Sequence, residues 1–203
     1  MPVNGAQGED RMGALLAISR VIDAVTDFVG YHVKWLVLVA VLVSAGNAII
    51  RKIFDMSSNA WLELQWQLFG AVFMLAAAYT LQKNAHVRID VLSSRLRKRT
   101  RDIIDLICHA VMLAPICVIL VWLAIPFFWE SLLGQEMSSN SGGLLVWPAK
   151  FLILAGFTLL LLQAVSEVIK RIAVLAGLIT DPEPVAVHGH APSDTAAAGG
   201  HNE

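Results

Sequence analysis

The chain has 203 residues, of which 57% are hydrophobic and 15% are charged. Soluble domains carry roughly 25% charged residues, so the composition argues against a soluble enzyme and indicates a small membrane protein that traverses the bilayer several times. The formal net charge of −1 hides a very uneven distribution of charge along the chain.

The N-terminal part divides into two segments. Residues 1–11 are polar and are expected to be mobile, whereas residues 12–31 show helical spacing of apolar residues. We predict an amphipathic helix that lies on the cytoplasmic membrane surface. Its polar side carries mainly Arg20, Asp23, Thr26 and Asp27. The alternative is that this segment extends the first membrane span, although its charged residues argue against full insertion.

Four long apolar stretches follow, near residues 33–50, 62–82, 103–129 and 146–169. About 18 or more apolar residues suffice to cross the hydrocarbon core as a helix, and lipid requires every backbone polar group to be paired within its segment. We therefore predict an all-α membrane protein in which an interfacial helix precedes a four-helix transmembrane domain, residues 32–175. The tail, residues 176–203, is rich in Pro, Ala, Gly and His and is predicted to be a disordered cytoplasmic segment.

Positive charge is concentrated on one side of these spans. If the spans alternate in direction, twelve Lys and Arg residues fall on one side and three, Arg51, Lys52 and Lys150, on the other. This bias predicts that both termini are cytoplasmic. We expect Arg51 and Lys52 to pair with Asp55 or to extend toward the outer interface. The basic run of the second loop is predicted to anchor the topology on anionic lipid rather than to bind nucleic acid; it comprises Arg95, Arg97, Lys98, Arg99 and Arg101.

One face of the second span carries polar and small residues, among them Glu63, Gln67 and Gly70. Such a stripe is expected to face protein, within this bundle or on a partner. Glu63 lies about one turn inside the outer boundary. The sequence leaves two roles for it, a structural or partner contact and an ion or proton site.

The sequence offers no constellation for catalysis and predicts neither enzyme activity, a bound cofactor nor a metal site. It contains no phosphate-binding loop, HExxH motif or paired-cysteine motif. Of the histidines considered as haem ligands, His32, His86 and His109, only His109 falls plausibly within a span, whereas a membrane haem needs two. Two alternatives remain, a membrane anchor for a redox complex and a small self-oligomerising exporter that uses Glu63.

Several short motifs occur in a characteristic order. His86-Val87-Arg88-Ile89-Asp90-Val91 follows the second span, Glu130-Ser131 ends the third, and Gly143-Leu144-Leu145-Val146-Trp147-Pro148 opens the fourth. In this order the chain resembles, over about residues 12–175, the small membrane subunit of tripartite ATP-independent periplasmic (TRAP) transporters, the DctQ-like family.

The resemblance implies a non-catalytic scaffold subunit in the bacterial inner membrane. It would pack against a large multi-span subunit, which moves an organic acid that a periplasmic binding protein delivers and couples this uptake to a sodium gradient. The outward loop 130–143 is a candidate docking site for the binding protein. Candidate partner contacts are Glu63, Gln67, Gly70, His86, Arg88, Asp90, Glu130, Trp147 and Pro148.

Overall fold

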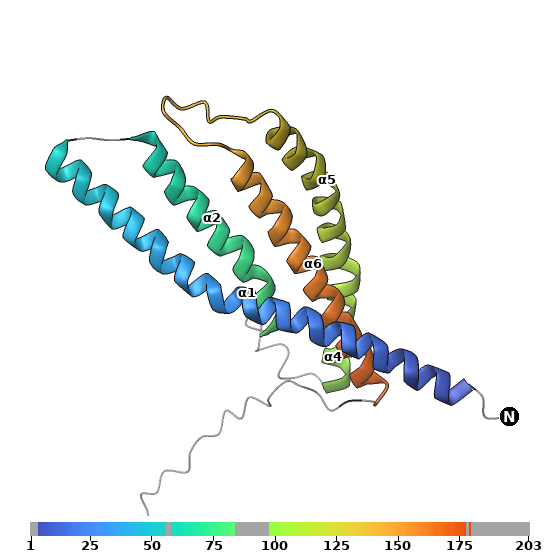
Figure 1. Cartoon of the computed structure of the whole chain (residues 1–203). Helices are drawn as coiled ribbons and strands as arrows, with labels where there is room; N and C mark the ends of the chain where they lie inside the picture. Colours follow the sequence, from blue (N-terminus) through green and yellow to red (C-terminus); the bar gives the residue numbers. More distant parts are fainter. Residues whose placement is uncertain (1–3, 56–57, 84–97, 178, 180–203) are drawn as a thin grey trace, which may run out of the picture.

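The computed structural model describes residues 4–55, 58–83, 98–177 and 179. Within these ranges the chain is helical, apart from short connections and one isolated β-bridge between Met137 and Leu145. Figure 1 shows the arrangement of the elements. These are α1 (Asn4–Phe54), α2 (Asn59–Gln82), α4 (Lys98–Ile107), the π-helical segment η1 (Cys108–Leu113), α5 (Ala114–Leu133) and α6 (Trp147–Leu175).

Four helical stretches are long and apolar enough to cross a membrane: Met12–Phe54, Asn59–Gln82, Ile103–Leu133 and Trp147–Leu175. They confirm the predicted all-α membrane fold with four spans. The third span runs through α4, η1 and α5. Pro115 lies in the first turn of α5, after the π-helical segment. The irregular hydrogen bonding there tolerates the absence of a backbone N–H donor on proline.

The N-terminal segment and the first span form one continuous helix. Helix α1 has 51 residues and is therefore about 77 Å long, more than twice the hydrocarbon thickness of about 30 Å. No proline lies within it, so the helix continues through residues 31–33, where the sequence analysis placed a boundary between two elements. Figure 1 shows α1 crossing α2 and α6 obliquely and projecting beyond the other helices at its N-terminal end.

A stripe of residues spaced seven apart buries one side of α1. The exposed fractions are 1% for Ser19, 2% for Thr26, 6% for Val33 and 0% for Ala40. Seven-residue spacing keeps one face of a helix against its neighbours. The large apolar side chains of the same region, such as Val21 and Phe28, are exposed instead. This inside-out pattern suits a helix whose outer solvent is lipid, because small and polar residues mediate helix packing there.

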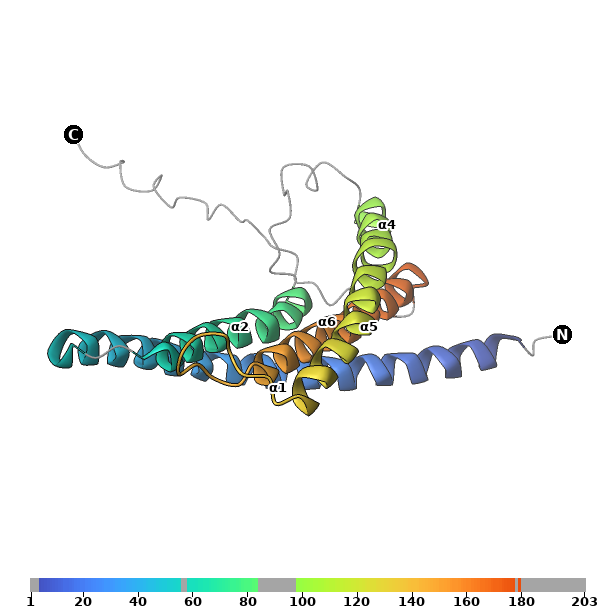
Figure 2. The ribbon, with the colours of Figure 1, turned by 90° about the horizontal axis from the view of Figure 1, so that it is seen from above.

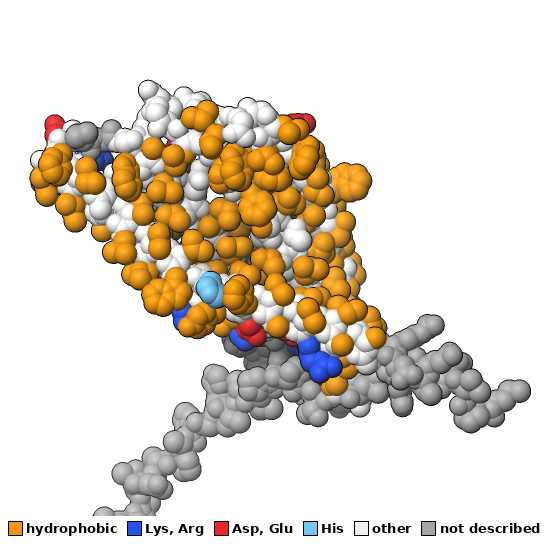
Figure 3. Space-filling model, in the orientation of Figure 1, with side chains coloured by type: hydrophobic (Ala, Val, Ile, Leu, Met, Phe, Trp, Pro, Cys, Tyr) orange, Lys and Arg blue, Asp and Glu red, His pale blue; other side chains and the backbone are white. Residues whose placement is uncertain are grey.

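Helix α6 is the centre of the bundle and contacts α1, α2 and α5. Close packing against α2 depends on Gly156, because a Cβ atom at this position would lie 2.7 Å from Cβ of Met74. Seen from above in Figure 2, α1, α2 and α6 form a thin layer from which α4 projects. Hydrophobic side chains cover the face shown in Figure 3, with charged groups towards its upper and lower edges.

Candidate functional site

The Glu63 carboxylate fixes the connection between α5 and α6 at one end of the bundle. It lies on the second turn of α2 and accepts hydrogen bonds from the Ser138 hydroxyl, from Nδ2 of Asn140 at 2.8 Å and from the backbone N–H of Leu144 at 2.6 Å. Its partners are 75 to 81 residues away in sequence. The carboxylate therefore serves as the acceptor around which this connection is folded. We call residues 134–146 the outer loop, after the side of the membrane that the charge distribution predicts for it.

Two further residues of α2 hold the same loop. Nε2 of Gln67 donates to the backbone carbonyl of Leu145 at 3.0 Å, and Nδ2 of Asn59 donates to that of Ser141 at 2.9 Å. Gly143 lets the loop approach closely here, since a Cβ atom at this position would lie 2.6 Å from Cβ of Ser138 and 2.8 Å from a carboxylate oxygen of Glu63. Glu63 and Gln67, which the sequence placed on one helical face, thus both bind the outer loop.

An ion pair fastens the base of the outer loop. The Lys150 ammonium, on the first turn of α6, lies 2.5 Å from a carboxylate oxygen of Glu136. The backbone closes at the same level, where Val146 N–H donates to the Glu136 carbonyl at 3.0 Å. The hydrogen bond from Lys150 lowers the pKa of the Glu136 carboxyl below its ordinary value of 4.5, because the ammonium stabilises the ionised form.

At the opposite end, polar side chains of α1 and α6 form a connected cluster. We call it the inner polar cluster, after the side of the membrane that the charge distribution predicts for it. It comprises Ser19, Asp23, Thr26, Gln163, Ser166, Glu167 and Lys170. Gln163 is fully buried at its centre. Its carbonyl accepts from Thr26 at 2.8 Å, and its Nε2 donates to Asp23 at 2.9 Å and to Glu167 at 3.1 Å.

Lys170 pairs with both carboxylates of the inner polar cluster. The Lys170 ammonium lies 3.2 Å from the Asp23 carboxylate and 2.5 Å from the Glu167 carboxylate. Ser166 donates to Asp23 at 2.9 Å and lies 2.7 Å from the Ser19 hydroxyl. A buried charge that loses its partner is strongly destabilising, so this cluster fixes where α1 crosses α6.

Two further ion pairs lie near the inner polar cluster and involve the ends of α2 and α4. Lys83, just after α2, forms a 2.7 Å ion pair with Asp27 of α1, and this contact raises the pKa of Lys83. Arg171 of α6 approaches Asp105 of α4 with an N–O distance of 3.7 Å. Charged side chains therefore lie in or directly after all four spans near the same end of the bundle.

The other candidate residues fall into three groups. Gly70 is exposed on α2, with nothing within 4 Å of the position that its Cβ would take. Glu130 is exposed on the last turns of α5, and Trp147 and Pro148 begin α6, half-buried. Among the basic anchors, Lys98, Arg99 and Arg101 lie in α4, where Arg99 is exposed. Predictions for His86, Arg88, Asp90, Arg95 and Arg97 fall outside the described residues.

Two of the histidines considered as haem ligands lie in the described residues, and each contacts a backbone carbonyl four residues before it. His32 is exposed and its Nδ1 lies 2.7 Å from the Phe28 carbonyl, while Nδ1 of His109 lies 2.6 Å from the Asp105 carbonyl. Within the part of the chain that the structure describes, no three His, Cys, Asp or Glu side chains converge as a metal site. Cys108 and Cys117 are free thiols, as their nine-residue separation predicts.

Sequence reasoning missed the inner polar cluster as a unit. The sequence predicted that Asp23 and Thr26 lie on the polar side of an interfacial helix, and no residue of α6 was predicted to face them. A signal was nevertheless present on α6, because Gln163, Glu167 and Lys170 are spaced four and three residues apart and share one helical face. A polar stripe of this length entering a span indicates a facing polar helix.

Comparison with known families agrees with this architecture. The chain matches the family model for tripartite ATP-independent periplasmic transporters, DctQ component, over residues 40–174. Neither the curated proteins nor the solved structures contain a match. The matched region covers more than half of the chain and includes the C-terminal end of α1 from residue 40 onward, all of α2, the third span and nearly all of α6. The chain therefore belongs to the DctQ component family of TRAP transporters, and is a small membrane subunit of such a transporter.

Proposed function

We propose that this subunit is a non-catalytic scaffold that packs against a large multi-span transporter subunit in the bacterial inner membrane. The observation that carries the proposal is the amount of spanning surface left uncovered within the chain. In the most apolar stretches of α1 and of the third span only 11% of residues are buried, compared with 17% in α2 and 33% in α6. A thin helical layer with two open apolar faces is suited to lie beside a larger membrane protein.

The α2 face around Gly70 is the proposed contact. Trp66 and Phe73 lie four residues before and three after Gly70, on the same side of the helix, and are 75% and 72% exposed. A glycine between two exposed rings leaves a notch into which a helix of the partner fits closely. Because a Cβ on Gly70 meets nothing in this chain, Gly70→Leu should leave the subunit folded and weaken its assembly.

We place both termini in the cytoplasm and the outer loop on the periplasmic side. Twelve of the fifteen Lys and Arg residues support this orientation. The outer loop, held rigid by Glu63, then faces the periplasmic binding protein and is a candidate docking surface. The His86-Val87-Arg88-Ile89-Asp90 segment falls on the cytoplasmic side and is proposed as a further contact with the large subunit.

Substrate transport belongs to the partners in this proposal. An organic acid arrives on the binding protein, the large subunit moves it with a sodium gradient, and this chain does not itself bind the acid. The polar groups at both ends of the bundle support a structural role, because they bind one another and so join the helices and the outer loop.

Co-purification tests the scaffold proposal. The tagged chain, extracted from its native membrane in mild detergent, should carry a larger multi-span protein, and Gly70→Leu should reduce the recovered partner while Gly46→Leu, at another glycine with open space around it, should not. A haem absorption band would instead support a redox anchor, and transport by the chain alone in vesicles would support an exporter. Arg88 or Asp90 substitutions that leave assembly and transport unchanged would remove those two residues from the contact.

A further inference from the structure

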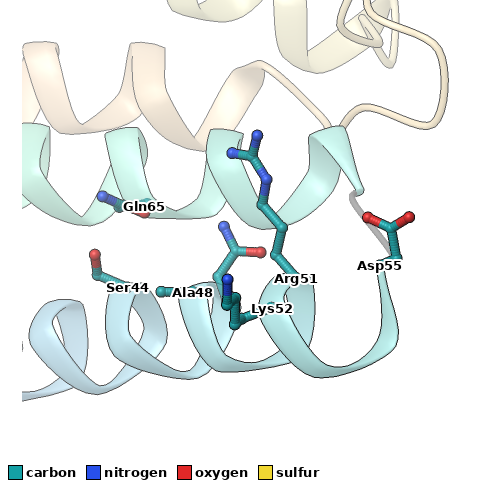
Figure 4. Close-up of a pocket in the computed structure, with 7 residues that line it drawn as sticks. Ser44, Ala48, Arg51, Lys52, Asp55 and Gln65 are labelled. Atoms are coloured by element: carbon teal, nitrogen blue, oxygen red, sulfur yellow. The ribbon is translucent and has the colours of Figure 1, made fainter.

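A polar pocket lies between α1 and α2 at the same end of the bundle as the outer loop. It has a volume of about 400 Å³ and is lined by Ser44, Asn47, Ala48, Arg51, Lys52, Asp55 and Gln65. Figure 4 shows the Arg51 side chain reaching from α1 towards α2, with Ser44, Ala48 and Lys52 on α1 and Gln65 on the facing helix. Pockets of a few hundred Å³ are the size that holds small polar ligands.

The cations of this pocket are unusual for their position. Arg51 and Lys52 are two of only three basic residues on the side with little positive charge. Across residues 4–55, 58–83, 98–177 and 179 no ion pair joins either of them to Asp55 or to another carboxylate, and all three side chains are exposed. The net charge of the three groups is +1, which is complementary to a single phosphodiester monoanion.

The depth of the pocket favours a membrane ligand over a soluble one. Seven residues separate Ser44 from Arg51, so the lining extends about 10 Å along α1, from the charged rim towards the hydrocarbon. Trp61 of α2, four residues before Gln65 in sequence, is exposed at this level. Exposed tryptophans of this kind mark the head-group region of a bilayer.

The order of chemical groups down the pocket follows that of a glycerophospholipid. Charged donors lie at the rim, where the phosphate of a lipid lies. One to two turns deeper, the amide of Asn47 and Gln65 and the hydroxyl of Ser44 offer donors at the depth of the ester carbonyls. Below them, exposed apolar side chains such as Val41 on α1 and Phe69 on α2 continue the same surface.

We propose that this pocket binds the phosphodiester head group of a phospholipid, with Arg51 and Lys52 on the phosphate oxygens. Arg presents paired donors to a phosphate and Lys adds a second positive charge. The bound lipid would lie between α1 and α2 and tie their outer ends together. Its assignment to the outer leaflet rests on the orientation proposed above, whereas the binding itself does not.

Native mass spectrometry of the full-length chain tests this proposal. Delipidated protein in detergent is titrated with palmitoyl-oleoyl phosphatidylglycerol, with a diacylglycerol of the same chains, and with inorganic phosphate. We expect the phospholipid to bind, and R51Q/K52Q to weaken it about tenfold, as for the loss of charge-assisted hydrogen bonds. Ala48→Leu, which narrows the pocket and keeps both charges, should weaken it as well.

The matched control is R20Q/K34Q, which removes two exposed cations elsewhere and should bind like the wild type. Loss of Arg51 and Lys52 strengthens the charge asymmetry, so the topology of the variant is not at risk; circular dichroism and elution volume check its fold. Three results would overturn the proposal: equal binding by R51Q/K52Q and its control, equal binding of the diacylglycerol, or displacement of the lipid by millimolar inorganic phosphate. Since the measurement uses this chain alone, its result is independent of whether the large subunit assembles.

Discussion

Glu63 is an acid at the edge of a membrane span, and its surroundings decide between the two roles that the sequence left for it. Donors from Ser138, Asn140 and the Leu144 backbone converge on its carboxylate. A proton carrier must exchange these partners during its cycle, whereas a loop anchor must keep them. The long-range pairing with a single loop favours the anchor.

Replacing Glu63 by Gln should therefore loosen the outer loop. The amide keeps the shape of the side chain but has one acceptor oxygen in place of two, and its NH₂ group faces donors. We expect faster hydrogen exchange in residues 134–146 and a lower Tm, with the spans unaffected. Glu130→Gln, an exposed carboxylate on α5, is the matched control. Unchanged loop exchange in the Glu63→Gln variant would contradict the anchoring role.

The Glu136–Lys150 ion pair predicts a pH dependence of stability. The pKa of Glu136 is lowered in the folded protein, so its contribution is present above the ordinary value of 4.5 and is lost as the pH falls through the lowered value. The Tm difference between wild type and Glu136→Gln should be constant from pH 7 to about 5 and should shrink under more acidic conditions. A difference that grows as the pH falls would refute the assignment.

At the scale of the element, the approach of α2 and α6 depends on a residue without a side chain. A methyl group on Gly156 would lie 2.7 Å from Cβ of Met74 and 3.1 Å from its carbonyl oxygen. Neither atom is at the flexible end of a side chain, so the helices themselves must separate.

Gly156→Ala is expected to destabilise the bundle by about 1–3 kcal/mol through overpacking, although alanine is the better helix former. Gly46→Ala, where a methyl group meets open space, should be neutral or slightly stabilising. Thermal unfolding of the two variants in detergent, followed by tryptophan fluorescence, separates packing from propensity. Equal Tm values would mean that the α2–α6 contact can relax at no cost.

Elements were predictable from the sequence where the signal was local. Runs of apolar residues located all four spans, because the requirement to satisfy the backbone in lipid acts on each segment separately. The inner polar cluster was not predictable from the sequence. A helical wheel shows that Asp23 and Thr26 lie on one side of the helix, but it does not show which element that side faces. In water a polar face turns outward, whereas on α1 it turns towards Gln163 and Lys170. The partner of Glu63 was hidden for the same reason, since the contact joins residues 81 positions apart.

At the scale of the whole molecule, the two charged ends of the bundle bound a slab of mainly apolar side chains (Figure 3). The inner polar cluster with Asp27, Lys83 and Asp105 defines one boundary. The outer loop with Glu63 and Lys150 defines the other. The proposed topology places these two boundaries on opposite sides of the inner membrane.

Cysteine labelling checks the topology directly. In a chain whose two native cysteines are replaced by alanine, Ser139→Cys in the outer loop should react with a membrane-impermeant maleimide in spheroplasts. Thr100→Cys in α4 should react only after lysis. Both positions are exposed, so the membrane alone should account for any difference between them. Reaction at Thr100→Cys in intact spheroplasts would reverse the orientation and move the proposed lipid pocket to the other leaflet.

The unbroken course of α1 restricts how its N-terminal part, residues 4–31, can change in length; we call this part the arm. One residue inserted after Tyr31 would turn the arm by about 100° and swing Ser19 and Thr26 away from α6 into lipid. Seven inserted residues would restore the facing side and shift the arm along its axis by about 10 Å. Insertions in steps of seven residues, about two helical turns, thus keep the same side of the arm towards α6, but they move its polar residues about 10 Å from their present partners.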